Sequence, residues 1–161
     1  MAFICADNVL GKWQRGSASK NIINDEVNRE YKMLNDPLAA ALTKIINAER
    51  VGKREVLIRP ASKMIKAVLH IMNENNYLGA FEEIPDGLNS VLKVNLLGNI
   101  NKCGVIKPRF SVKKSEFEKW EKRYLPAKDF GLILLSTPTG IMTHTDAKGK
   151  NTGGKLLVYC Y

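Results

Sequence analysis

Apolar positions recur with two periods along this chain, and the change of period predicts where its elements lie. In the first half, apolar residues three and four positions apart indicate two amphipathic helices. One begins at Asp36 and Pro37, an N-cap acceptor before a residue suited to the first helical position, and ends at Gly52. The other begins at the N-cap Ser62 and ends near Asn75. The expected apolar faces are Leu38, Leu42, Ile45 and Ile46 in the first helix, and Met64, Ile65, Val68, Leu69 and Met72 in the second.

Extended apolar segments predict strands between and after these helices. In the first half they are Glu55–Arg59, Ala80–Ile84 and Ser90–Leu96, with a turn at Pro85-Asp86-Gly87. In the second half they are Val105–Val112, Phe130–Ser136 and Leu156–Tyr161, the last with Leu156, Val158 and Cys160 on one face.

Two shorter helices are expected in the second half. The pair Ser115 and Glu118 resembles a capping box, and Pro126 would end the helix that follows. Its face would carry Phe117, Trp120, Glu121 and Tyr124. Thr143 and Asp146 indicate one further helical turn.

These elements predict an α+β fold of two small lobes. Residues 33–98 would form an α-β-α-β-β lobe, and residues 99–161 a β-rich lobe with one or two short helices. The polar stretch Gly98–Gly104 is the expected boundary. Residues 1–32 show no sustained periodicity and are expected to be an extension that another molecule orders.

The composition indicates a folded protein with a polyanionic partner. The net charge is +9 over 161 residues, and 45% of the residues are hydrophobic, which excludes a disordered basic tail. No apolar run reaches the length of a membrane span, so no membrane partner is expected. Residues 1–24 carry one acid, Asp7, among basic and hydroxyl side chains, so a transit peptide is an alternative there.

The cysteines and histidines predict neither a disulfide framework nor a metal site. The three cysteines are widely spaced without a CxxC pair, and the only histidines are His70 and His144. A reducing compartment and the absence of any cofactor are therefore expected. Cys103, beside Gly104, would be a turn residue, and Cys160 a small core residue.

The segment after the buried strand Phe130–Ser136 is the strongest candidate for a binding surface. Ser136, Thr137 and Thr139 place small donors and acceptors at the end of the strand, and Gly140 allows close approach of the backbone. Lys148, Lys150 and Lys155 would surround this turn with positive charge. Since no acid–base pair accompanies them, the segment favours binding of a phosphate-rich macromolecule over catalysis.

Two enzymatic interpretations of this segment fail on their motifs. Residues 149–155 match GxxxxGK, but Leu156 lacks the hydroxyl that binds magnesium, and a strand instead of a helix is expected to follow. Ser136, His144 and Asp146 do not form a GxSxG elbow, so a hydrolase triad is not expected and His144 is assigned to the surface. The double glycine Gly153-Gly154 is expected to form a tight turn.

A basic run in the first half favours phosphate contact. Because helix ends and loops can lie together, several of its members are expected to gather into one patch. The run comprises Lys44, Arg50, Lys53, Arg54, Arg59, Lys63 and Lys66. A second basic cluster comprises Lys102, Lys107, Arg109, Lys113 and Lys114. The alternating charges of residues 116–123 indicate a solvated face, and Trp120 and Tyr124 are expected in the core instead of serving as base-stacking platforms.

At these residues the chain resembles a known family, the universal eighth protein of the small ribosomal subunit. Gly131–Lys148, read as GLILLSTPTGIMTHTDAK, carries the family's order of glycine, apolar strand, Ser-Thr, glycine and Ile-Met. Asn35–Leu38 with Thr43–Ile45, and Pro60–Lys63, resemble the starts of its first two helices. Asn101–Phe110 resembles the archaeal and eukaryotic branch. Lys155 departs from the bacterial pattern, in which an acid follows the glycines.

The resemblance implies a structural ribosomal protein of the cytosol that is not an enzyme. It would bind the central domain of small-subunit rRNA, contact neighbouring small-subunit proteins and support assembly. A free RNA-binding regulator that uses the same surface on messenger RNA is the alternative. The expected RNA-binding residues are Ser136, Thr137, Thr139, Gly140, Gly153 and Gly154 in the second lobe, and Lys44, Lys53, Arg54, Ser62 and Lys63 in the first.

Overall fold

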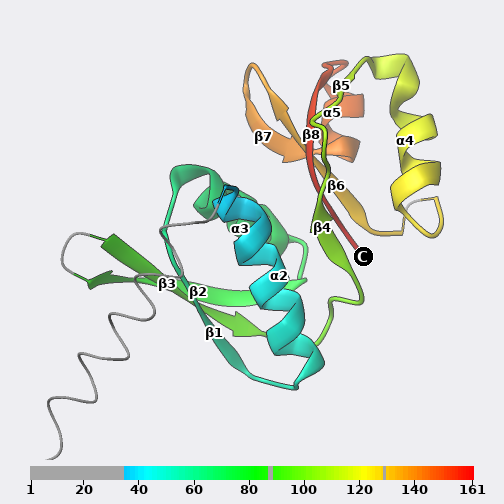
Figure 1. Ribbon diagram of the computed structural model, residues 1–161. Coiled ribbons are helices and arrows are strands. Elements are labelled where there is room, and N and C mark those ends of the chain that lie inside the picture. The colour runs from blue at the N-terminus through cyan, green and yellow to red at the C-terminus, as the bar shows by residue number, and fades with distance from the viewer. Residues whose placement is uncertain (1–34, 87–88, 129) are drawn as a thin grey trace, which may run out of the picture. The chain divides into compact units, whose positions relative to one another are not determined.

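The computed structural model describes residues 35–86, 89–128 and 130–161, and the elements are labelled as in Figure 1. The expectations for residues 1–32 lie outside the described residues. The first sheet is antiparallel in the order β1-β3-β2. Its strands are β1 (Glu55–Ile58), β2 (Leu78–Asp86) and β3 (Asn89–Leu96), and its helices are α2 (Pro37–Arg50) and α3 (Lys63–Glu74). The second sheet has the order β4-β8-β6-β7, with β5 paired to β8, so the predicted α+β class is confirmed.

The two long helices begin where their caps predict. The Asp36 Oδ1 atom accepts hydrogen bonds from the N–H groups of Leu38 at 3.1 Å and Ala39 at 3.3 Å. In α3 the Ser62 hydroxyl accepts one from the Ile65 N–H at 3.2 Å. One predicted core position is wrong: Met64 is 36% exposed. The buried stripe runs i, i+3, i+4, i+7 from Ile65, which leaves Met64 at its margin.

The first sheet shows the alternation that one covered face produces. In β1, Val56 and Ile58 are buried while Glu55 and Leu57 are exposed. The buried side chains join those of α2 and α3 in one core cluster. The other face of the sheet therefore remains outside that core.

The second half has more and shorter elements than the sequence predicts. The strands are β4 (Cys103–Val105), β5 (Ser111–Val112), β6 (Leu132–Thr137), β7 (Gly140–Thr143) and β8 (Gly154–Cys160); the helices are η1 (Lys114–Glu116), α4 (Phe117–Tyr124) and α5 (His144–Gly149). The single predicted strand Val105–Val112 is wrong, since its two ends pair with different parts of β8. Strand β7 was not predicted. The predicted cap of α5 is confirmed by a 3.2 Å hydrogen bond from the Asp146 N–H to the Thr143 hydroxyl.

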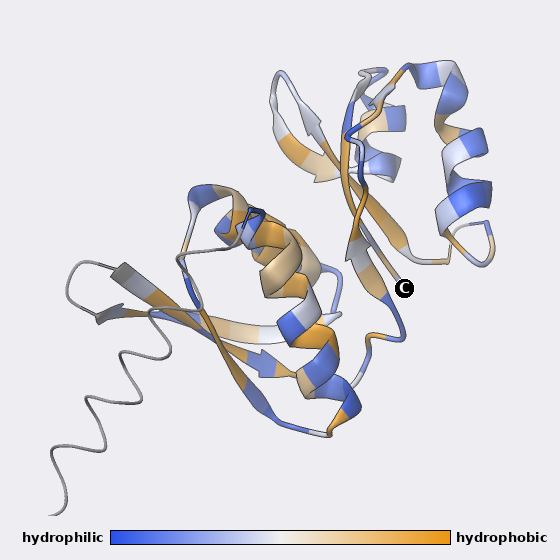
Figure 2. Ribbon diagram, in the orientation of Figure 1, coloured by the Kyte–Doolittle hydropathy of each residue, from blue (hydrophilic) through white to orange (hydrophobic). Residues whose placement is uncertain are grey.

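The second sheet is buried on both faces. Along β6, Leu132 and Leu134 belong to the core cluster that α2 and α3 share. Ile133 and Leu135 belong to a second cluster on the other face, beneath α4 and α5. This explains why Leu132–Leu135 of the strand form a continuous apolar run, and Figure 2 shows hydrophobic colour over much of β6.

A register shift changes the faces of β8. Leu134 pairs with Val158, but the next residue, Leu135, pairs with Leu156, so Leu157 is the extra residue of a bulge. Leu156 therefore packs in the second cluster, whereas Val158 and Cys160 pack in the first. The prediction that all three share one face is wrong for Leu156.

Three local predictions in the second half are also wrong. The predicted capping box is displaced by two residues, because the Glu116 carboxylate accepts from the Lys113 N–H at 3.2 Å and Ser115 lies inside η1. Glu121 is 5% exposed, unlike the solvated charges around it. Cys103 is a buried strand residue opposite Cys160, and burial raises the pKa of its thiol to about 12. The predicted core position of Cys160 is confirmed.

Candidate nucleic-acid interface

The turn between β6 and β7 is held by its own hydroxyl groups. Thr137, 8% exposed, donates a hydrogen bond to the Gly140 carbonyl at 2.8 Å and lies 3.0 Å from the Thr139 hydroxyl. Because Thr137 has one proton, Thr139 is the donor of that second bond, and the Thr139 oxygen keeps its acceptor capacity. Thr137 thus organises the turn, while Pro138, Thr139 and Gly140 are exposed to a partner.

Gly140 meets the backbone requirement of this turn. Its φ is +131°, a conformation that other residues adopt only with strain. A Cβ atom built there would meet no protein atom within 4 Å. Glycine is therefore needed here for its backbone angle, and the space beside it is open.

Gly153 and Gly154 serve a different purpose from the predicted tight turn. A Cβ on Gly153 would lie 2.5 Å from the Val112 carbonyl oxygen, and one on Gly154 would lie 2.6 Å from that of Ser136. The left-handed residue of this loop is Asn151, with φ +56°. The double glycine thus lets the start of β8 fit between the backbones of β5 and β6.

A hollow of about 690 Å³ collects these segments at one end of the second sheet. Its lining includes Ser136, Pro138, Gly153 and Gly154, so part of the predicted site is brought together. The exposed side chains of Lys113 and Lys155 also line it, with Glu116 as the acid beside them. Lys113 was expected in another cluster, because only the pairing of β5 with β8 brings it here.

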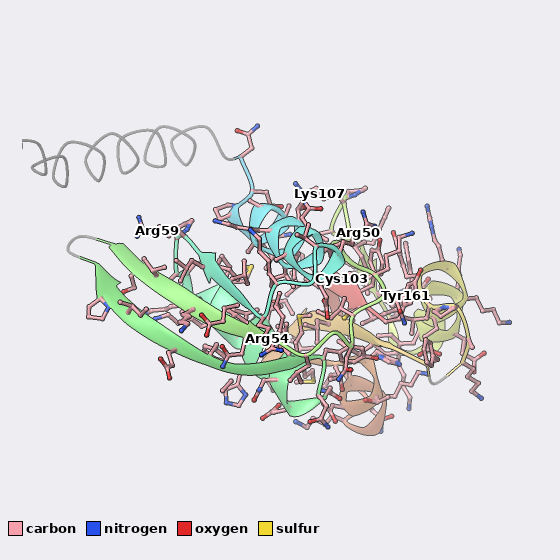
Figure 3. All side chains as sticks on the ribbon, turned by 90° about the horizontal axis from the view of Figure 1, so that it is seen from below. Arg50, Arg54, Arg59, Cys103, Lys107 and Tyr161 are labelled. Carbon is pink, nitrogen blue, oxygen red and sulfur yellow. The ribbon has the colours of Figure 1, made fainter. Side chains whose placement is uncertain are left out.

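The structure does not bring the basic residues of the first lobe into one patch. Lys53 and Arg54 line a hollow of about 550 Å³ before β1, and Lys63 follows Ser62 after β1. The four residues of the strand alone span about 13 Å. Figure 3 shows Arg54 and Arg59, which flank β1, at well-separated places. Lys44 lies on the exposed side of α2.

Several charges that look available in the sequence are paired in the fold. Lys66 contacts the Glu83 carboxylate at 2.6 Å, and Lys93 contacts that of Glu55 at 2.9 Å. Lys148, predicted to surround the turn, pairs with the buried carboxylate of Glu121. These pairs reduce the positive charge that is open to a polyanion.

The hydrolase triad is absent because its members have other partners. His144 is 2% exposed, its Nδ1 accepts from the Ile133 N–H at 3.2 Å, and its Nε2 lies 3.6 Å from Glu121 Oε1. Asp146 accepts from the Thr143 hydroxyl at 2.6 Å. The assignment of His144 to the surface is therefore wrong, since this side chain joins β6 to α4.

The structure also disfavours a nucleotide loop at residues 149–155. The segment follows α5 and enters strand β8, so no helix N-terminus is available for phosphates. Within residues 35–86, 89–128 and 130–161, no group of three or more His, Cys, Asp or Glu side chains forms a metal site. The helices described in these ranges include none that is long and apolar enough to cross a membrane.

A comparison with known families identifies the chain. Residues 36–161 match the family model described as Ribosomal protein S8. The match spans well over half of the chain and contains both lobes and all eleven expected RNA-binding residues. It confirms the family that the residues around the β6–β7 turn indicate. The chain belongs to the ribosomal protein S8 family, whose members are rRNA-binding components of the ribosome.

Proposed function

We propose that this ribosomal protein binds the central domain of small-subunit rRNA and supports its assembly in cytosolic ribosomes. The observation that carries the proposal is the hollow beside the β6–β7 turn, where Ser136, Gly153 and Gly154 meet exposed Lys113 and Lys155. The hollow belongs to a chain of the S8 family, which is a family of structural ribosomal proteins and not of enzymes.

Recognition at the turn would depend on shape. The minor groove of an RNA helix is wide and shallow and displays 2′-hydroxyl groups. Thr139 retains an acceptor for such a hydroxyl, and Gly140 presents bare backbone without a side chain in the way. Lys113 and Lys155 would contact the flanking phosphates, which add affinity without sequence preference.

The first lobe would contribute two separate phosphate contacts. Lys53 with Arg54 would form one, and Lys63 the other, because β1 lies between them. Ser62 would act indirectly, since its hydroxyl already caps α3. The protein would thereby hold an RNA segment at spaced points and fix its geometry, with other ribosomal proteins as neighbours.

Two substitutions, Gly140→Val and Ser136→Ala, test this proposal against a matched glycine control. Gly140→Val should weaken binding of a central-domain rRNA fragment at least roughly tenfold. Valine at this positive φ introduces about 1–3 kcal/mol of backbone strain, and the turn must move to relieve it. Ser136→Ala should cost less than about fivefold, the value of one hydrogen bond. Gly149→Val is the control, since Gly149 has no positive φ and no atom near its Cβ position.

Titration of each variant against the rRNA fragment and a fully paired duplex of equal length gives the answer. Equal losses on both RNAs would contradict shape recognition at the turn. Co-sedimentation with small subunits after a high-salt wash separates a ribosomal component from a free regulator of messenger RNA. Loss of the protein from the subunits in that wash would favour the regulator.

A further inference from the structure

A ladder of aromatic rings runs along the α4 side of the second sheet, away from the β6–β7 turn. Ring centroids lie 4.7 Å apart for Phe110 and Trp120 and 6.0 Å for Trp120 and Tyr124. The series continues at 5.4 Å from Tyr124 to Tyr159 and 6.4 Å from Tyr159 to Tyr161. All five side chains are half-buried, so Trp120 and Tyr124 are not enclosed core residues.

The last four rings of the ladder are stacked, each on the next. Trp120 and Tyr124 are inclined by 7°, and the Tyr124–Tyr159 and Tyr159–Tyr161 pairs each by 28°. Tyr159 lies over Gly104 of β4, where a Cβ would come 3.0 Å from its hydroxyl oxygen. Near-parallel rings that a neighbouring strand supports form a preorganised stacking surface.

A hollow of about 250 Å³ opens at the tyrosine end of this ladder. Tyr124, Tyr159 and Tyr161 line it together with Lys102 and Arg123, and no acidic side chain is among its described lining residues. It is smaller than the roughly 300–1,000 Å³ of a drug-sized ligand site. The space therefore suits one planar ring and its phosphate better than a double helix.

Arg123 is held in place by the ladder itself. Its guanidinium carbon lies 5.6 Å from the Trp120 ring centroid and 5.7 Å from that of Tyr124. Cation–π contact fixes the plane of the group and leaves its N–H edge to donate to a phosphate. Lys102, on the segment before β4, adds a second cation to the lining of the hollow.

We propose that this Lys102–Arg123–tyrosine hollow binds an unpaired nucleotide of RNA, with its base stacked on the tyrosines and its phosphate held by the two cations. The inference rests on the proposed function, because it adds a single-strand contact to a protein that binds rRNA. Residue 161 and the β6–β7 turn lie at opposite ends of the second sheet (Figure 1). Two RNA segments can thus be held by one domain.

The combination of rings and cations favours a nucleotide over an acidic peptide. Peptide carboxylates would use Lys102 and Arg123 but would gain little from the rings, whereas every base has a face that stacks. The stacked rings run from Trp120 to Tyr161, and Tyr161, labelled in Figure 3, lines the hollow. Stacking then distinguishes the two partners, and the experiment measures it.

The test uses the full chain and a labelled single-stranded uridine hexamer. Fluorescence anisotropy should show salt-dependent binding that Tyr161→Leu weakens roughly 5- to 100-fold, the value of one stacked base. Arg123→Gln should reduce the salt slope by about 0.7, one single-strand phosphate. Tyr161→Phe keeps the ring, and Lys119→Gln removes an exposed charge of α4 outside the hollow, so neither should weaken binding.

The central-domain fragment serves as the second RNA in every titration. Unchanged fragment binding by Tyr161→Leu and Arg123→Gln, with loss of hexamer binding, supports a separate site. Failure of the hexamer to bind while the fragment binds overturns this inference and leaves the proposed function standing. If the unmodified protein binds the hexamer but not the fragment, the proposed function is overturned and the hollow is spared.

Two further measurements keep the test valid if a variant unfolds. A 4-thiouridine hexamer should crosslink to the peptide that carries Tyr159 and Tyr161 in the unmodified protein; crosslinks confined to the β6–β7 turn would overturn the proposal. A glutamate-rich hexapeptide is the competing ligand. Displacement of the RNA by this peptide at equal concentration would assign the hollow to an acidic protein segment instead.

Discussion

The two sheets of this protein bury their residues differently, and the difference decides where each can bind. The first sheet covers one face with α2 and α3, so its strands alternate between buried and exposed positions, as in Val56, Leu57 and Ile58. The second sheet lies between two core clusters, and Leu134 and Leu135 are both fully buried. Only its ends and edges remain for a partner.

Charge and shape divide between the two sheets accordingly. The pairs Lys93–Glu55 and Lys66–Glu83 join residues of the first sheet and α3. Its candidate phosphate contacts, Lys53 and Lys63, lie before and after β1. The second sheet instead presents a glycine turn at one end and the Lys102–Arg123–tyrosine hollow at the other. Because this sheet is covered on both faces, we expect it to contact RNA at its ends.

The largest expected effects test the burial itself. Leu134→Ala and Leu135→Ala should each lower the free energy of unfolding by roughly 2–5 kcal/mol, because each empties a filled core on its own face of β6. In the first sheet Ile58→Ala should cost a similar amount. The Leu57 side chain is 49% exposed, so Leu57→Ala should change the free energy of unfolding by no more than about 0.5 kcal/mol. Urea denaturation measures all four. A loss of unfolding free energy well below this range for Leu135→Ala would contradict burial on both faces of the second sheet.

Glycines sharpen the same contrast at a smaller scale. Gly154→Ala should destabilise by about 1–3 kcal/mol, because its Cβ would lie 2.6 Å from the Ser136 carbonyl oxygen and rigid backbone must move. Gly79→Ala in β2 is the matched substitution of the first sheet. There the nearest atom is the Asn95 Cβ at 3.1 Å, so the cost should be smaller. Equal thermal melting temperatures for the two variants would refute this distinction.

Asp36 links α2 of the first lobe to the β4–β5 connection of the second. Partial burial opposes its ionisation, but the Lys107 ammonium at 2.9 Å and the N–H groups of α2 lower the pKa of Asp36 below 3.8. A carboxyl whose pKa is lower in the folded state stabilises the fold at pH values above its unfolded-state pKa. This contribution disappears as the pH falls through the folded-state pKa. Asp36→Ala should cost about 1 kcal/mol at pH 7.

The pH profile separates the charge of Asp36 from its role as a cap. Asp36→Asn keeps an N-cap acceptor but cannot ionise. The stability difference between the unmodified protein and Asp36→Asn should therefore shrink between about pH 5 and pH 3, measured by urea denaturation at each pH. A difference that stays constant over this range would show that the ion pair with Lys107 contributes nothing.

The smallest expected effects concern the phosphate contacts of the first lobe. Lys53→Gln and Lys63→Gln should each flatten the salt dependence of rRNA-fragment binding by about one unit of slope. Because β1 separates them, the double variant should flatten it by about two. Lys93→Gln is the control, since Lys93 is already paired with Glu55. If Lys93→Gln flattens the salt dependence as much as Lys53→Gln does, the lysines at the ends of β1 would not differ from a paired lysine within the sheet.

The sequence by itself determined the features that depend on near neighbours. Asp36 and Ser62 cap their helices because a side-chain acceptor reaches N–H groups two or three residues ahead. The apolar period of α2 and α3 follows from 3.6 residues per turn. The order of residues around the β6–β7 turn was enough to indicate the family, because small hydroxyl groups, glycine and apolar strand residues stand there at short, fixed spacings.

Only the tertiary structure decided the features that depend on strand pairing. Three features join segments that lie too far apart in the sequence for a local period to predict them. They are the bulge at Leu157, the approach of Gly154 to Ser136, and the burial of His144 against Ile133. The same pairing carries Lys113 into the hollow and separates Lys53 from Lys63. Side-chain period is local, whereas register is set by the partner strand across the sheet.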